Sequence, residues 1–263
     1  MLRLHTIAQS HYAEKARWAL DLSGIPYEER AHVPVLHLFA TLPRGGRTVP
    51  LLAEGSGSLT DSTEILLHLD QRKGGGWLYP SGPTRETVLF LEDTFDEKLG
   101  PQVRKWAFAH LLPHRALIAR MMSRDAPGWE RALVPVVLPL VCWAIRSRMR
   151  VDPANASRYR DRIVASFADV DERVHDGRRF MVGERLTAAD IAFCSLAAPV
   201  LFPPGYRGSL PDLADIPPAM RADVDTFRHT AAGRYALRLF EEERLGSDPN
   251  GAKSPALPAG SKD

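Results

Sequence analysis

The sequence predicts a molecule in two parts, an α/β domain followed by an all-α domain. Strand-like alternation and helical spacing both occur in the first 72 residues. After the Gly- and Pro-rich stretch KGGGWLYPSGP, only helical spacing recurs. We therefore expect four segments: residues 1–76, the α/β domain; residues 77–84, a linker; residues 85–245, the helical domain; and residues 246–263, a disordered tail with few aromatic residues.

The predicted order of the N-terminal elements is strand, helix, strand, connection, strand, strand and helix. Residues 2–6 alternate as in a strand, and residues 12–20 have apolar positions at helical spacing until Gly24 ends the helix. Three more strands are expected, in YEERAHV, in TVPLLA and, after the turn EGSGS, in a short LT segment. The final helix of this part begins at Asp61 or Ser62.

The second part is expected to contain five helices, at residues 84–112, 129–148, 157–176, 187–200 and 217–244. Its apolar run ALVPVVLPLVCWAI is shorter than the roughly 20 residues that cross a bilayer, and it contains Pro135 and Pro139. We interpret this run as a kinked, fully buried helix. A membrane-docking helix is the alternative, but no basic face is interleaved with the run.

Composition and charge favour a cytoplasmic globular protein. The net charge of +2 gives no strong field toward nucleic acid or a membrane surface. Arg residues are frequent in RSRMRVDPANASRYRDR, but the acidic residues among them indicate a solvated face. Cys142 and Cys194 lie in apolar patterns, which predicts small core residues in a reducing compartment. The first residues lack the apolar region of a signal peptide.

Three short motifs carry side chains that could bind a ligand or react. In SHYAEKARWAL, Ser10 stands where a helix begins, so its hydroxyl is either a plain N-cap or a group that points into a pocket. In TVPLL, a cis Val49–Pro50 bond would expose the backbone N–H and C=O of Val49 to a peptide-like ligand, whereas a trans proline would mark a strand edge.

The third motif, LTDSTEILLHLD, opens a helix. Asp61 or Ser62 is a natural N-cap, and Glu64 follows Asp61 by three residues, so capping alone accounts for the pattern. The same helix N-terminus could receive a ligand carboxylate, while Asp61 could hold an ammonium group.

In this order the three motifs resemble the glutathione-binding half of cytosolic glutathione S-transferases, which is thioredoxin-like in that superfamily. The later stretch RRFMVGERLTAADIAF resembles the helical-domain signature of the same superfamily. There Thr187 and Asp190 fit a capping box, and Leu186 with Ile191 fits the hydrophobic staple beside it. The likeness covers residues 1–72 and roughly 160–200, while residues 101–155 are less familiar.

The resemblance implies a role for Ser10. It occupies the place of the catalytic residue in the serine- and cysteine-type theta, zeta and omega classes. The stretch SHYAEKAR parallels the omega pattern Cys-Pro-Phe-Ala-x-Arg-x-Arg, with serine for the cysteine and His11 for the proline. Serine at this position argues against thiol–disulfide exchange and favours zeta- or theta-like activation of a thiolate.

The resemblance also implies two sets of ligand-binding residues. Those expected to hold glutathione are Val49 and Pro50 by the backbone, Asp61 and Ser62 at the γ-glutamyl end, and His37, Arg47 and Thr48 at the glycyl carboxylate. Those expected to line the second-substrate site are Tyr12, Trp106, Phe108 and His110, although an aromatic stripe of this kind also suits an interdomain core.

The implied function is a transferase that uses glutathione as co-substrate and attacks a small hydrophobic electrophile, by conjugation or isomerisation, in detoxification. A homodimer is expected by analogy, with no metal, nucleic acid or membrane partner. Two alternatives stay open. One is a non-catalytic binding or interaction protein on the same scaffold, and the other is an omega-like thiol transferase or reductase.

Overall fold

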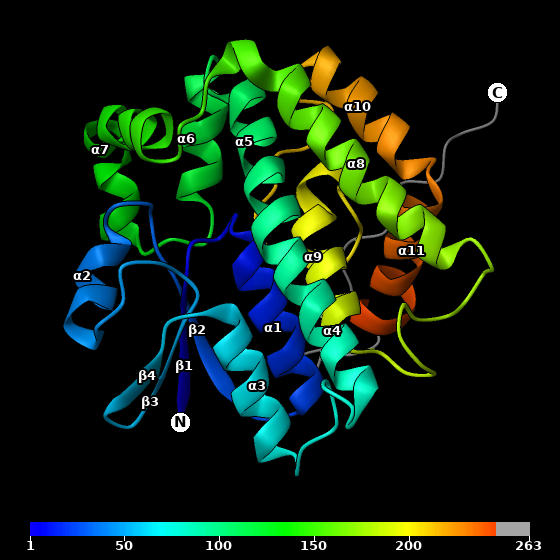
Figure 1. Ribbon diagram of the computed structural model, residues 1–263. Coiled ribbons are helices and arrows are strands. Elements are labelled where there is room, and N and C mark those ends of the chain that lie inside the picture. The colour runs from blue at the N-terminus through cyan, green and yellow to red at the C-terminus, as the bar shows by residue number, and fades with distance from the viewer. Residues whose placement is uncertain (246–263) are drawn as a thin grey trace, which may run out of the picture.

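The computed structural model describes residues 1–245, in which a small sheet lies beside a larger body of helices (Figure 1). The predicted tail, residues 246–263, lies outside the described residues.

A mixed four-stranded sheet forms the core of the N-terminal part. Its strands are β1 (Leu2–Thr6), β2 (Tyr27–Ala31), β3 (Leu51–Glu54) and β4 (Gly57–Leu59). Their spatial order is β2-β1-β3-β4; β1 runs parallel to β2 and antiparallel to β3, and β3 and β4 form an antiparallel hairpin. The long connection needed between parallel strands is supplied by a helix. The order of these strands and helices along the chain is the predicted one, and the sheet is mixed as expected and thioredoxin-like.

Helices α1 (His11–Ser23) and α3 (Ser62–Arg72) pack against each other beside the sheet, and a short helix α2 (His37–Thr41) lies in the connection before β3 (Figure 1). Ser10 and Asp61 cap the first turns of α1 and α3 through their side chains, and Gly24 ends α1 in a left-handed conformation. Helix α1 is buried on nearly every side because α9 (Ala188–Leu201) packs against its other face.

The remaining helices are α4 (Pro83–Thr94), α5 (Gly100–Leu111), α6 (Arg115–Ser123), α7 (Gly128–Arg148), α8 (Ala156–Val174), α10 (Pro218–Arg228) and α11 (Ala231–Leu239). Helices α4 and α5 are joined without a break by a π-helical turn, Phe95–Leu99, so the single helix expected at 84–112 is nearly right. Helix α6 was not predicted. The single helix expected at 217–244 is wrong, because Thr230 accepts a hydrogen bond from the Gly233 N–H and starts α11 as a new helix.

Helix α9 is the centre of the helical part, and all of its residues are buried. Its N-terminus has the predicted capping box: the Asp190 carboxylate accepts from the Thr187 N–H at 2.8 Å. The same carboxylate accepts from the Met181 N–H at 2.8 Å and from the Tyr235 hydroxyl, so it also ties α11 to the start of α9. Both cysteines are buried and free, as predicted.

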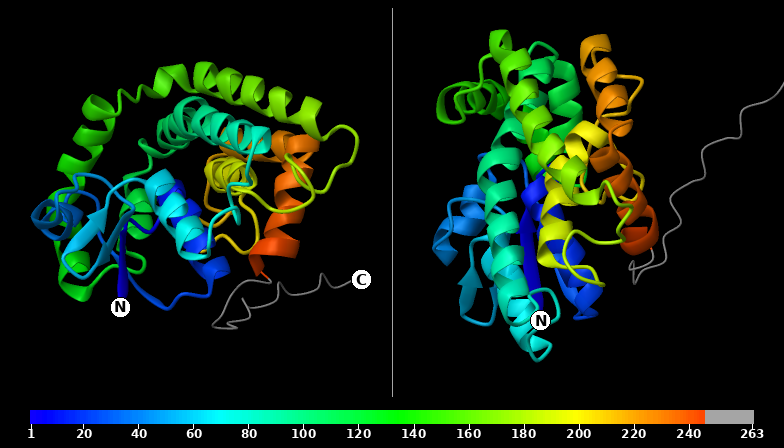
Figure 2. Two further views of the ribbon diagram at one scale, coloured as in Figure 1. Left: turned by 60° about the horizontal axis from the view of Figure 1, so that its bottom comes forward. Right: turned by 45° about the vertical axis from the view of Figure 1, so that its right-hand side comes forward.

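The expectation of a fully buried helix at 132–145 is wrong. Helix α7 lies at the periphery (Figures 1 and 2). Several of its large apolar side chains are exposed. These are Trp129, Leu133, Val136, Leu140 and Trp143, of which Val136 is 75% exposed. The buried positions of the helix are Glu130, Val134, Val141, Cys142 and Ile145, and Leu140 and Trp143 border the cavity described below. Within residues 1–245, α7 is the one helix long and apolar enough to cross a bilayer by length and composition, and 28% of its apolar window is buried.

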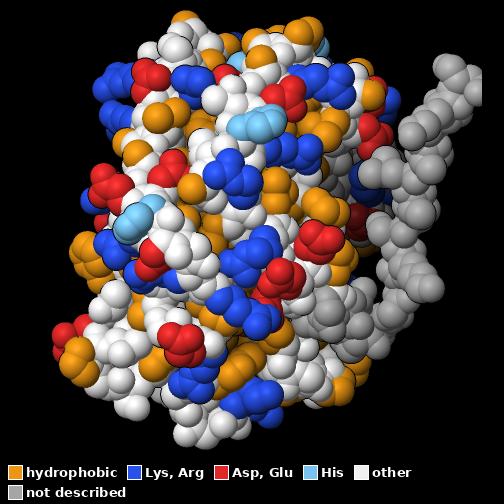
Figure 3. Space-filling model, turned by 90° about the vertical axis from the view of Figure 1, so that its right-hand side faces the viewer, with side chains coloured by type: hydrophobic (Ala, Val, Ile, Leu, Met, Phe, Trp, Pro, Cys, Tyr) orange, Lys and Arg blue, Asp and Glu red, His pale blue; other side chains and the backbone are white. Residues whose placement is uncertain are grey.

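Basic and acidic side chains alternate on the right-hand side of the molecule as seen in Figure 1 (Figure 3). The surface charges of the molecule include ion pairs such as Arg178–Asp176 at 2.8 Å, in which both side chains are exposed. Pairs of this kind add little to stability, and they indicate a solvated surface.

Candidate active site

A cavity of about 800 Å³ lies between the N-terminal end of α1 and helices α5, α6 and α7. The N-terminal part contributes the turn before α1, the start of α1, and the connection around α2. The helical part contributes mostly apolar side chains: Ala107, Phe108, Leu111, Met121, Met122, Leu140, Val141, Trp143, Ala144, Ile145, Met149, Pro199, Phe202, Leu210, Pro211 and Met220. A concave, largely apolar site with a few polar groups on one wall is typical of small-molecule binding.

Ser10 lies on the polar wall of this cavity, at the N-terminus of α1. Its hydroxyl oxygen accepts from the Ala13 N–H at 3.2 Å, so the N-cap interpretation is confirmed. A serine hydroxyl can accept and donate at the same time, and no acceptor for the Ser10 proton is found among residues 1–245. The cap therefore holds the side chain in place and leaves its donor available to a ligand.

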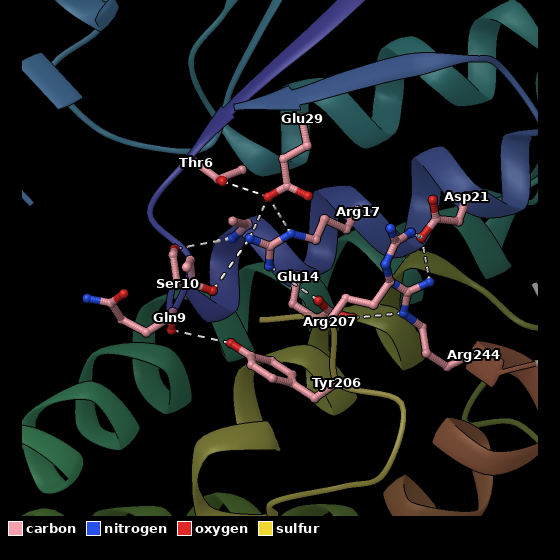
Figure 4. A network of polar contacts seen from close by, with 12 residues as sticks. Thr6, Gln9, Ser10, Glu14, Arg17, Asp21, Glu29, Tyr206, Arg207 and Arg244 are labelled. Carbon is pink, nitrogen blue, oxygen red and sulfur yellow. Dashed lines mark hydrogen bonds and ion pairs between the residues drawn. The ribbon is translucent and has the colours of Figure 1, made fainter. Parts of the chain in front are cut away.

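The turn that presents Ser10 is fixed from the helical part of the chain (Figure 4). The Tyr206 hydroxyl donates to the Gln9 carbonyl at 3.3 Å, and the Ser209 N–H donates to the Ala8 carbonyl at 3.0 Å. Gly208 allows this close approach, because a Cβ there would lie 2.7 Å from the Ala8 carbonyl oxygen. The position of Ser10 thus depends on residues some 200 positions away.

Buried ion pairs fix α1 beneath this turn (Figure 4). Arg17 donates to Glu29 at 2.8 Å and pairs with Glu14 at 3.4 Å. Arg244, near the end of the described chain, pairs with Glu14 at 2.8 Å and with Asp21 at 2.6 Å. Glu14, Arg17 and Arg244 are almost completely buried, so each charge needs a partner. These pairs join the two parts of the molecule through α1.

A second buried cluster joins α1 to α3 and to the helices that follow. Lys15 donates to Thr63 at 3.0 Å and pairs with Glu92 at 2.7 Å and with Asp96 at 2.6 Å. The Tyr79 hydroxyl donates to Glu92 at 2.7 Å. Together the two clusters hold α1 as a rigid support for the site.

His11 and Tyr12 follow Ser10 in the cavity wall, but neither is poised to move a proton. Burial, with a smaller effect from the charge of Arg104, lowers the pKa of His11 to about 3, so its ring is neutral at pH 7. The Tyr12 hydroxyl donates to the Asp96 carbonyl at 2.8 Å, and burial raises the Tyr12 pKa above its usual value. Ser10 is the better-placed donor of the three.

The cavity brings together several of the predicted site residues: Ser10, Tyr12, His37, Arg47, Thr48, Val49 and Phe108. The Val49–Pro50 peptide bond is cis, the first of the two alternatives that the sequence left open. No backbone hydrogen bond of Val49 is found in the described part of the chain, so its N–H and C=O are available to a ligand. Burial lowers the pKa of His37, and its Nε2 lies 3.4 Å from the Arg47 carbonyl oxygen.

Other predicted residues do not line the cavity. Pro50 and Ser62 are buried, and the Asp61 carboxylate accepts from the Thr63 N–H at 2.8 Å as the cap of α3. Trp106 is completely buried, and its Nε1–H donates to Asp223 at 2.9 Å. His110 lies beside Trp106, with ring centroids 5.2 Å apart. Of the predicted aromatic wall, Tyr12 and Phe108 lie at the cavity, because the opposite face of α5 packs into the core.

The less familiar segment, residues 101–155, supplies most of the cavity wall that sequence reasoning missed. Helices α6 and α7 contribute Met121, Met122 and a run of residues between Leu140 and Met149. Arg104 on α5 and Arg148 on α7 also line the cavity. The adjacent methionines and the two-sided apolar pattern of α7 were the available signals, but neither specifies a cavity.

The fold agrees with the comparisons to known proteins. Residues 4–77 match the family described as glutathione S-transferase, N-terminal domain. A glutathione S-transferase of Pseudomonas putida strain F1 is 26% identical over 199 residues, which cover 74% of this chain and 72% of that protein.

Solved structures share the same architecture over nearly the whole chain. The beta-etherase LigF of Sphingobium sp. strain SYK-6 is 20% identical with a TM-score of 0.56, over 90% of this chain and 98% of that one. A glutathione S-transferase of Rhodospirillum rubrum F11 is 20% identical with a TM-score of 0.55, over 92% and 99%. The chain therefore has the glutathione S-transferase fold. The family match over residues 4–77 and the Pseudomonas putida relative support the superfamily and a glutathione-related transferase function.

Proposed function

We propose that this protein is a glutathione transferase of the serine type, in which the Ser10 hydroxyl donates to the sulfur of bound glutathione and holds it as a thiolate. The thiolate then attacks an apolar electrophile that lies against α5, α6 and α7. One observation carries the proposal: the Ser10 hydroxyl lines the cavity at the N-terminus of α1, with its oxygen fixed by the Ala13 N–H and its proton available.

The Ser10 hydroxyl and the dipole of α1 can together stabilise the glutathione thiolate enough to lower its pKa by about two units. A free thiol has a pKa of about 8.5, so little thiolate exists at neutral pH. A decrease of about two units corresponds to roughly 2.7 kcal/mol. One hydrogen bond to a charged group contributes about 1.5–3 kcal/mol, and the dipole of α1 adds about 0.3–1 kcal/mol.

The rest of the polar wall suits the peptide. The free N–H and C=O of Val49 can pair with glutathione as an added strand, and Arg47 can meet a carboxylate. Binding of the γ-glutamyl end by Asp61 and Ser62 remains part of the proposal. So do the cytoplasmic location, the two-fold dimer and the role in detoxification. Neither Cys142 nor Cys194 lines the cavity, which leaves the omega-like alternative without a thiol at the site.

The proposal is tested by titrating the ultraviolet thiolate absorbance of bound glutathione in the wild type, Ser10→Ala and Ser10→Thr. We expect the thiol pKa to return toward that of free glutathione in Ser10→Ala and to stay low in Ser10→Thr, which keeps a hydroxyl. An unchanged pKa in Ser10→Ala would remove Ser10 from the mechanism. Calorimetry that detects no glutathione binding to the wild type would instead favour the non-catalytic binding protein.

A further inference from the structure

The cavity is apolar but carries charge of one sign. Three arginines line it, Arg47, Arg104 and Arg148, and none of the described residues that line it is Asp or Glu. Apolar walls lower the local dielectric and strengthen the field of such cations. A bound molecule therefore meets a positive potential on an otherwise hydrophobic surface.

Of the three arginines, Arg104 is the one with a buried nitrogen that lacks a hydrogen-bond acceptor. It lies on α5, and its Nε is buried without a hydrogen-bond partner. No carboxylate pairs with its guanidinium within residues 1–245; the contact it makes is with the Tyr12 ring, at 5.9 Å from the centroid. The buried residues Arg17 and Arg244, by contrast, both pair with carboxylates. Arg104 as a whole is half-buried, but a buried N–H without an acceptor is costly, so the Nε–H of Arg104 points to a ligand as the missing acceptor.

Arg104 also stands at the boundary between the two halves of the cavity. Its guanidinium lies over the ring of Tyr12 in the first turn of α1, two residues after Ser10. Its neighbours along α5, Ala107, Phe108 and Leu111, belong to the apolar wall. Arg47 lies instead in the connection that leads to Val49, where the proposed function puts the peptide. Arg104 is thus placed to bind a polar group of the second substrate.

We propose that the second substrate is an apolar electrophile that carries a carboxylate, and that Arg104 is the specificity-determining residue that binds this carboxylate while α6 and α7 enclose the apolar body. That the second substrate is an electrophile rests on the proposed function. The preference for an anion follows from the arginines that line the cavity. Arginine suits the task because its planar guanidinium matches a carboxylate in geometry and stays charged.

The experiment compares two probes of equal shape, biphenyl-4-carboxylate and biphenyl-4-carboxamide, by isothermal titration calorimetry. The full chain is used with excess S-methylglutathione, which fills the peptide subsite and has no thiol to react. We expect the wild type to bind the carboxylate at least about 10-fold more tightly than the carboxamide. Arg104→Gln should abolish this preference, and Arg104→Lys, which keeps the charge, should retain part of it.

Arg115→Gln is the matched control, because Arg115 is exposed on α6 and does not line the cavity. It should keep the full preference. Equal binding of the two probes to the wild type, or a preference that survives in Arg104→Gln, would overturn the proposal. So would an equal loss of S-methylglutathione binding in Arg104→Gln, since Arg104 would then hold the peptide. Absence of S-methylglutathione binding to the wild type would contradict the proposed function instead, and the probe titrations would still report the anion preference.

Discussion

Replacing Arg244 by methionine removes a buried cation that joins the end of the helical part to α1. Arg244 pairs with Glu14 at 2.8 Å and with Asp21 at 2.6 Å, and its side chain is 1% exposed. Methionine fills much of the same space without a charge, so the change isolates the ion pairs from packing.

The expected loss of unfolding free energy depends on which partners Glu14 and Asp21 keep when Arg244 is replaced. Loss of one partner from a buried ion pair costs about 3–5 kcal/mol. Glu14 keeps Arg17 at 3.4 Å, and Asp21 keeps Arg207 at 2.8 Å and the Tyr27 hydroxyl. We therefore expect the lower end, about 3 kcal/mol of unfolding free energy. For a chain of this size, that corresponds to a decrease in Tm of about 10 °C.

Urea denaturation followed by far-ultraviolet circular dichroism measures this change. Arg238→Met is the matched control, because the Arg238–Glu242 pair is partly exposed and should contribute no more than about 1 kcal/mol. An Arg244→Met protein within about 1 kcal/mol of the wild type would refute the reasoning. It would mean that the buried charges of α1 do not depend on this arginine.

Two further predictions concern a group that lines the cavity, His11, and a contact that holds α7, through Glu130. The lowered pKa of His11, about 3, means that its neutral ring stabilises the fold above pH 6.5 and that this contribution is lost as the pH falls toward 3. Between pH 7 and pH 5 the wild type should lose about 2 kcal/mol through this residue, and His11→Asn should show a correspondingly smaller loss in urea titrations at the two pH values. Glu130 on α7 accepts from the Val33 N–H at 2.6 Å and lies 2.7 Å from His32 Nδ1, so Glu130→Ala should cost about 2 kcal/mol and speed tryptic cleavage at Arg131. Cleavage at the wild-type rate would show that α7 is held by its apolar face alone.

Most of the fold could be predicted from the sequence, because local signals and tertiary packing agree there. The strands, the cap at Ser10 and the capping box at Thr187 all have short-range signatures. The cis bond before Pro50 has none, and the local motif left cis and trans open. The division between α10 and α11 was missed, because apolar spacing continues across it and only the Thr230 cap marks the new start.

The site was predicted less completely, because its second wall depends on long-range packing. Periodicity predicted that the residues of α7 are apolar, but not which of its faces meets the protein. Trp106 and Phe108 have similar chemistry, yet the rotation of α5 puts the first in the core and the second at the cavity. Burial of Glu14, Lys15 and Arg17 was likewise invisible, since their partners lie far away in the sequence.

The most direct measurement of the central claim is the position of the glutathione sulfur in a crystal structure of the complex. We predict that the sulfur lies within about 3.5 Å of Ser10 Oγ, at the N-terminus of α1, with the peptide paired to the Val49 backbone. A sulfur bound beyond hydrogen-bond reach of Ser10, or a tripeptide held elsewhere in the cavity, would contradict the account.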